Sequence, residues 1–81
     1  MSVEERVKKV TAQVLKCDPA KIKPAANFVR DLGAESIQSI ELVAAFEEEF
    51  DIEMDQDEAL SVQTVGEAVR FIDGVLRKQK G

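Results

Sequence analysis

The chain has 81 residues, 44% of them hydrophobic and 33% charged, which suits one small globular domain over residues 1–81. The net charge is −5, and no apolar run could span a bilayer or serve as a signal peptide, so we expect a cytoplasmic protein without membrane insertion. One cysteine excludes an internal disulfide, and the absence of histidine removes the usual general base and the commonest metal ligand. We therefore expect neither an enzyme nor a metal site.

The first part of the chain predicts a helix followed by a long loop. Ser2 and Glu5 form a capping box, and apolar residues at helical spacing continue to about Lys16. Residues 17–34 contain both prolines and predict a loop that holds one short helical turn. Three apolar side chains are expected to anchor this loop on the core: Ile22, Phe28 and Leu32.

The rest of the chain predicts three more helices. One covers residues 36–50, and a short one covers residues 56–61. A last helix follows the capping residues Thr64 and Glu67, and residues 77–81 are expected to fray. No segment alternates as a strand does. We therefore predict an all-α fold, a small bundle of three main helices and one short helix, with the long loop between the first two.

The second predicted helix has two apolar faces. One face supplies side chains for a core: Leu42, Val43, Phe46 and Phe50. The other combines an apolar strip with three acids: Ile37, Ile40, Ala44, Glu41, Glu47 and Glu48. Carboxylates inside a small core would be unfavourable without a paired base, so we expect this second face to be exposed as a docking patch. The alternative is that Ile37 and Ile40 pack under the loop of residues 17–34.

Charge is divided unevenly along the chain. Residues 1–30 carry seven Lys or Arg and three acids, residues 31–69 carry twelve acids and no base, and residues 70–81 carry four bases and one acid. Such an acidic centre repels phosphate backbones, so we expect no nucleic-acid partner. The centre is either a solvated face or a surface that attracts basic partners.

Residues 31–37 read D-L-G-A-E-S-I, and the chain continues with I-E-L-V at residues 40–43 and E-E-E-F-D at residues 47–51. Over nearly its whole length the chain resembles acyl carrier proteins. The resemblance implies that Ser36 carries a 4′-phosphopantetheine arm. A phosphopantetheinyl transferase would move this arm from coenzyme A to the Ser36 hydroxyl, and the chain would then be a phosphoprotein. The arm's thiol would hold acyl intermediates as thioesters. The chain would act as a monomer and present them to acyl-transferring and chain-elongating enzymes of fatty acid or related lipid or polyketide synthesis.

The same resemblance implies two surfaces. Basic docking surfaces of partner enzymes would contact a mixed patch: Glu35, Ile37, Ile40, Glu41, Glu47 and Glu48. An interior pocket for the acyl chain would be lined by six residues: Phe28, Phe46, Met54, Ala59, Val62 and Ala68. Phe46 stands where the family more often has an aliphatic side chain, so we expect its ring to narrow this pocket. Arg30 and Gln38 stand where acids are common, which indicates altered partner choice and a specialised or accessory carrier.

Other interpretations remain open at this point. An acidic protein-interaction bundle without a prosthetic group would explain the acidic face, with Ser36 serving only as a helix N-cap. A peptidyl or aryl carrier would use the same arm, although a second glycine before the serine is usual there. A calcium loop over residues 51–62 is disfavoured, because Gln56 replaces the required glycine and Val62 replaces the bidentate acid.

Overall fold

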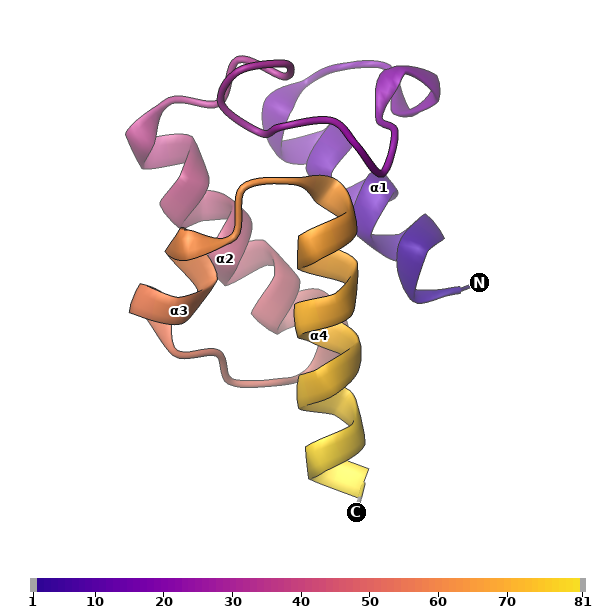
Figure 1. Ribbon diagram of the computed structural model, residues 1–81, viewed down its shortest axis with the longest axis vertical. Coiled ribbons are helices and arrows are strands. Elements are labelled where there is room, and N and C mark those ends of the chain that lie inside the picture. Colours follow the sequence, from indigo (N-terminus) through magenta and orange to yellow (C-terminus); the bar gives the residue numbers. More distant parts are fainter. Residues whose placement is uncertain (1, 81) are drawn as a thin grey trace.

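The computed structural model describes residues 2–80, and its helices form a small bundle (Figure 1). Three long helices and one short helix follow one another along the chain: α1 (Val3–Leu15), α2 (Ser36–Phe50), α3 (Gln56–Ser61) and α4 (Val65–Lys80). A 3₁₀ turn, η1 (Pro19–Lys21), lies in the long loop between α1 and α2. Residues 2–80 contain no strand, and the nearest approach to one is an isolated bridge between Asn27 and Thr64. The predicted all-α bundle with one short helix is confirmed.

The helix boundaries follow the capping residues. Three predicted caps accept the backbone N–H three residues further on, at 3.1–3.2 Å: Ser2 from Glu5, Asp55 from Glu58 and Thr64 from Glu67. At their C-terminal ends, α1 and α2 stop at residues in the left-handed region, Lys16 with φ 55° and Asp51 with φ 54°. The bounds predicted for α2 and α3 agree with the structure because these signals are local.

The last helix is longer than the sequence indicated. Helical backbone continues to Lys80, whereas fraying was expected from Arg77 onward. Arg77 donates to Asp73 one turn earlier, with 3.0 Å between Nη2 and Oδ2, and this ion pair supports the final turns. Gly81, the last residue of the expected tail, lies outside the described residues.

The core forms where α1 packs against both α2 and α4, while α3 packs against α2. Buried side chains from all these helices and from the loop contribute to it: Val7, Val10, Ile22, Phe28, Leu42, Phe46, Phe50, Ile52, Ala59, Val65, Ala68 and Ile72. Of the three predicted loop anchors, Ile22 and Phe28 are buried, and Leu32 is half-buried against the core. The buried Thr11 hydroxyl donates to the Val7 carbonyl oxygen at 2.7 Å, so no polar group of that side chain is left unpaired.

Backbone hydrogen bonds hold residues 24–28 of the long loop against the start of α4. Gly66 N–H donates to the Pro24 carbonyl at 2.8 Å, and Val65 N–H donates to the Ala26 carbonyl at 3.0 Å. The first N–H groups of a helix have no hydrogen-bond partner within the helix. Carbonyl groups of the loop accept from two of these N–H groups of α4, which would otherwise donate to water. This attachment gives a long loop a fixed path over the bundle (Figure 1).

Candidate functional site

Ser36 is exposed at the first position of α2. The N-cap is the preceding residue, Glu35, whose backbone is extended (φ −86°, ψ 167°), so the interpretation of Ser36 as an N-cap is wrong. Gln38 Oε1 accepts the Glu35 N–H at 2.9 Å, and the Ser39 hydroxyl donates to the Glu35 carbonyl at 3.3 Å. Neighbouring side chains therefore organise this helix start, and the Ser36 hydroxyl has no part in capping it. Gln38, which the sequence suggested as a change in the docking surface, also has this structural role.

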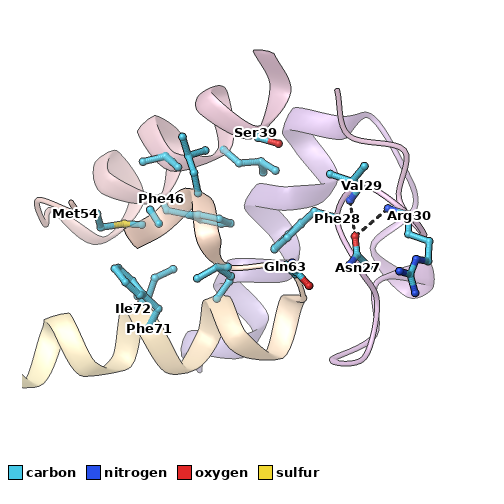
Figure 2. Close-up of a pocket in the computed structure, with 16 residues that line it drawn as sticks. Asn27, Phe28, Val29, Arg30, Ser39, Phe46, Met54, Gln63, Phe71 and Ile72 are labelled. Atoms are coloured by element: carbon cyan, nitrogen blue, oxygen red, sulfur yellow. Dashed lines mark hydrogen bonds between the residues drawn. The ribbon is translucent and has the colours of Figure 1, made fainter. Parts of the chain in front are cut away.

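The turn that precedes α2 is fixed by hydrogen bonds from backbone N–H groups to two side chains. Asn27 Oδ1 accepts the N–H groups of Val29 and Arg30, both at 2.9 Å (Figure 2). Asp31 Oδ2 accepts the Asn27 N–H at 2.7 Å. Gly33 then adopts φ 72°, a conformation that glycine tolerates better than other residues. These contacts fix the backbone conformation of the residues that lead to Ser36.

The outer face of α2 is exposed, as the mixed apolar and acidic pattern predicted. Ile37 is 66% exposed and Ile40 is 47% exposed, so the alternative in which they pack under the loop is wrong. The acids Glu35, Glu41 and Glu48 are exposed as well. The structure therefore brings an apolar strip and acidic side chains together on one helix face beside Ser36.

Glu47 differs from the other predicted docking acids. It is half-buried, and its Oε2 accepts the Met54 N–H at 2.9 Å. The backbone of Asp51 is in the left-handed region, and the chain changes direction there after α2. The Met54 N–H therefore lies beside the Glu47 carboxylate, seven residues earlier in the sequence. The prediction treated Glu47 as an unpaired acid on an open face, but one of its oxygens stabilises the connection to α3.

A cavity of about 400 Å³ lies between α2, α3, α4 and the turn at residues 27–30 (Figure 2). All six residues predicted to form an acyl pocket line this cavity: Phe28, Phe46, Met54, Ala59, Val62 and Ala68. Ten further residues line it: Asn27, Val29, Arg30, Ser39, Leu42, Val43, Leu60, Gln63, Phe71 and Ile72. Among these, Phe71 was missed although it follows Ala68 by three residues, a spacing that places both on neighbouring positions of one helix surface.

The sequence also did not reveal how α1 contacts the end of α2. Arg6 Nε donates to Glu49 Oε2 at 2.9 Å, and Arg6 Nη2 donates to the Glu49 carbonyl at 2.7 Å. The guanidinium lies 4.4 Å from the centre of the Phe50 ring. Partners 43 residues apart in the chain leave no local pattern that would identify them.

Two features of other protein classes are absent from residues 2–80. No helix in this part of the chain is long and apolar enough to cross a membrane. Within the same residues, His, Cys, Asp and Glu side chains form no group of three that could hold a metal ion.

Comparison with known proteins gives a consistent result. The family model described as "Phosphopantetheine attachment site" matches residues 5–72. The acyl carrier protein of Phenylobacterium zucineum (strain HLK1) is 54% identical over 70 residues, which cover 86% of this chain and 89% of that protein. The acyl carrier proteins of two Caulobacter vibrioides strains, NA1000 / CB15N and ATCC 19089 / CIP 103742 / CB 15, are each 54% identical over 68 residues, covering 84% of this chain and 87% of those proteins.

These matches favour an acyl carrier over both alternatives, an interaction bundle without a prosthetic group and a peptidyl or aryl carrier. The chain therefore belongs to the acyl carrier protein family: it is a carrier rather than an enzyme, and it works with a covalently attached 4′-phosphopantetheine.

Proposed function

We propose that Ser36 carries the 4′-phosphopantetheine arm and that the chain uses it to carry acyl groups in fatty acid or related lipid or polyketide synthesis. The arm supplies the thiol on which acyl groups are held as thioesters. The observation that carries this proposal is an exposed first-turn serine that does not cap its helix and lies one turn before Ser39, a residue of the cavity wall.

The surroundings of Ser36 fit a phosphodiester. Its hydroxyl lies in the first turn of α2, where backbone N–H groups lack partners within the helix and the helix dipole is positive. Glu35 beside it is negatively charged and does not favour free anions. A covalently bound phosphate needs no net attraction to remain in place, so the neighbouring acid does not oppose the assignment.

The cavity supports a role in sheltering the acyl chain. Its volume of about 400 Å³ is within the range of ligand pockets, roughly 300–1,000 Å³. Apolar side chains form most of its wall, and the six residues of the predicted acyl pocket are among them: Phe28, Phe46, Met54, Ala59, Val62 and Ala68. Moving each CH₂ group of a chain from water into such a wall contributes about 0.8 kcal/mol. A hydrocarbon cargo would therefore bind there without any polar contact.

The outer face of α2 supports docking onto basic enzyme surfaces. Ile37 and Ile40 provide exposed apolar area, and Glu35, Glu41 and Glu48 provide negative charge around it. Glu47 adds charge to the same face, although one of its oxygens is bound to the Met54 N–H. Opposite charges on the carrier and on an enzyme accelerate their association, and a small apolar interface allows the two proteins to dissociate. A carrier that visits several enzymes in turn requires both properties.

The partners in this proposal are a phosphopantetheinyl transferase, which loads the arm, and acyl-transferring and chain-elongating enzymes, which use it. The carrier itself acts as a monomer in the cytoplasm. Arg30, exposed at the edge of the cavity, is the basic residue nearest to Ser36 in the sequence and supports a selective set of partners.

Intact-mass measurement tests the attachment site. The protein is incubated with coenzyme A and a broad-specificity phosphopantetheinyl transferase, and one pantetheinyl addition is expected. Ser36→Ala should remain unmodified while its circular dichroism stays helical. Ser39→Ala is the matched control, because it removes a hydroxyl one turn away that is half-buried and bonded to a carbonyl. An addition on Ser36→Ala, or none on the unaltered protein, would refute the proposal.

A further inference from the structure

The outer face of α2 accounts for two of the four large apolar side chains that are exposed in residues 2–80. The other two are Val29, 63% exposed in the turn before α2, and Leu60, 42% exposed in α3. Both line the same cavity, and so do the exposed residues Arg30 and Gln63. We refer to these four residues as the loop patch: Val29, Arg30, Leu60 and Gln63. Exposed apolar side chains together with arginine are typical of protein interfaces.

Backbone hydrogen bonds hold the two segments of the loop patch together. Phe28 N–H donates to the Gln63 carbonyl at 2.9 Å, and an isolated bridge pairs the residues next to these two. The turn that carries Val29 is therefore joined to the segment that follows α3, three residues after Leu60. The loop patch is a defined surface, although its residues come from two parts of the chain.

The loop patch also lies close to Ser36. Gly33 N–H donates to the Val29 carbonyl at 3.2 Å, and Ala34 N–H donates to the Phe28 carbonyl at 2.8 Å. Ser36 is three residues after Gly33, and an extended chain spans at most about 11 Å over that length. A protein interface of standard size covers about 800 Å² on each partner, which corresponds to a radius of roughly 16 Å. An enzyme centred on the Ser36 hydroxyl would therefore also cover the turn that carries Val29.

Arg30 is a base beside an acidic part of the chain, since residues 31–69 contain twelve acids and no base. None of the three ion pairs in residues 2–80 includes Arg30. The carboxylate of the neighbouring Asp31 instead accepts the Asn27 N–H at 2.7 Å. Asn27 Oδ1 holds the Arg30 N–H, and Figure 2 shows the Arg30 side chain pointing away from the cavity. The backbone is thus fixed, while the guanidinium is available to a group outside the chain.

A guanidinium next to apolar side chains is suited to a carboxylate. Its planar N–H groups match both carboxylate oxygens, and apolar neighbours exclude water that would weaken the pair. A basic surface would instead meet Arg30 as a like charge, which opposes association. The loop patch therefore favours the opposite charge from the outer face of α2, whose acids favour a basic surface.

We propose that the phosphopantetheinyl transferase of the same organism contacts the loop patch with an acidic side chain that pairs with Arg30. Bases of the transferase face the acids of α2, and this carboxylate, flanked by apolar side chains, faces Arg30, Val29 and Leu60. The transferase is the partner that has to make this contact, because it reacts at the Ser36 hydroxyl itself. Acyl-transferring enzymes react at the thiol, at the far end of the arm. The inference rests on the proposed attachment at Ser36 and on the proposed transferase.

The test measures kcat/KM for loading of the carrier by this transferase, with coenzyme A as the donor and intact mass as the readout. Arg30→Glu reverses the charge, Arg30→Gln removes it, and Arg30→Lys keeps it without the planar donor group. Lys23→Glu is the matched control, because Lys23 is exposed in the same loop but does not belong to the loop patch. Circular dichroism checks the folding of each variant, and Arg30→Gln is a second variant in case Arg30→Glu folds poorly.

We expect kcat/KM to fall by about tenfold in Arg30→Glu, mainly through a higher KM, and by less in Arg30→Gln. Arg30→Lys should keep most of the rate, and Lys23→Glu should change it by less than about twofold. The ratio of kcat/KM between the unaltered protein and Arg30→Glu should decrease as salt is added, because salt screens the charges of an exposed pair.

A charge exchange identifies the opposing residue. Each Asp and Glu on the transferase surface around its active site is replaced singly by Lys. One of these transferase variants should load Arg30→Glu faster than the unaltered transferase does, because the two reversed charges attract each other again.

An equal or higher kcat/KM in Arg30→Glu would overturn the inference, because a uniformly basic transferase would bind the reversed charge better. An equal loss in Lys23→Glu would overturn it as well, since net charge would then explain the effect. The same holds if no transferase variant improves the loading of Arg30→Glu. Failure of the proposed attachment site is recognised separately: the unaltered protein would then gain no pantetheinyl group, or Ser36→Ala would still gain one.

Discussion

Replacing Arg6 with glutamine should destabilise the fold by roughly 2 kcal/mol, because this side chain makes three contacts with the end of α2. It pairs with the Glu49 carboxylate at 2.9 Å, donates to the Glu49 carbonyl at 2.7 Å, and lies 4.4 Å from the centre of the Phe50 ring. The carbonyl is among the last in α2 and has no partner within the helix, so Arg6 satisfies an acceptor and places positive charge at the helix C-terminus.

The three contacts are of different strength. The two charged side chains are 36% and 35% exposed, so solvent screening limits the ion pair to about 0.5 kcal/mol. The hydrogen bond from the charged Arg6 guanidinium to the Glu49 carbonyl contributes about 1 kcal/mol, because solvent weakens it as well. The contact of Arg6 with the Phe50 ring contributes about 0.5 kcal/mol. A domain of this length has a stability of roughly 4–12 kcal/mol. The variant should therefore lose a large share of it, and its melting temperature should fall by about 8–16 °C.

Urea denaturation followed by far-UV circular dichroism measures this loss, with an unchanged m-value as the sign that only stability has changed. Glu49→Gln removes the carboxylate charge but keeps the carbonyl and ring contacts of Arg6, so it should lose only about 0.5 kcal/mol. A loss below about 0.5 kcal/mol in Arg6→Gln would refute the reasoning. Equal losses in the two variants would also refute it, since the ion pair would then account for the whole effect.

Two further predictions concern α4 and the docking face. Gly66→Ala should destabilise by about 1 kcal/mol, because its Cβ would lie 3.1 Å from the Pro24 carbonyl oxygen that Gly66 N–H binds. Gly74→Ala, whose Cβ would meet nothing outside its own helix within 4 Å, should instead stabilise by about 0.5–1 kcal/mol. Thermal unfolding compares the two, and changes of the same sign would contradict the strain assigned to Gly66. Glu48→Lys should lower kcat/KM for transferase loading at low salt and less so at high salt. A loss that does not depend on salt would argue against electrostatic docking.

The sequence by itself predicted the bounds of α2 and α3 and favoured exposure of the outer face of α2. The caps at Asp55 and Thr64 act within three residues, so they can be recognised without knowledge of the rest of the fold. The period of α2 likewise separates its buried face from the face of Ile37 and Ile40. The family motif around Ser36 supplied the candidate attachment site, because its residues are consecutive in the chain.

Only the tertiary structure decided which distant groups meet. The spacing of Glu47 placed it on the outer face, but the reversal of the chain at Asp51 brings the Met54 N–H to its carboxylate. The contact of Arg6 with the end of α2 likewise depends on how two helices pack, and no local pattern predicts it. The same holds for the position of the Phe46 ring within the cavity: helical period assigns a side chain to the interior, whereas its neighbours there come from other parts of the chain.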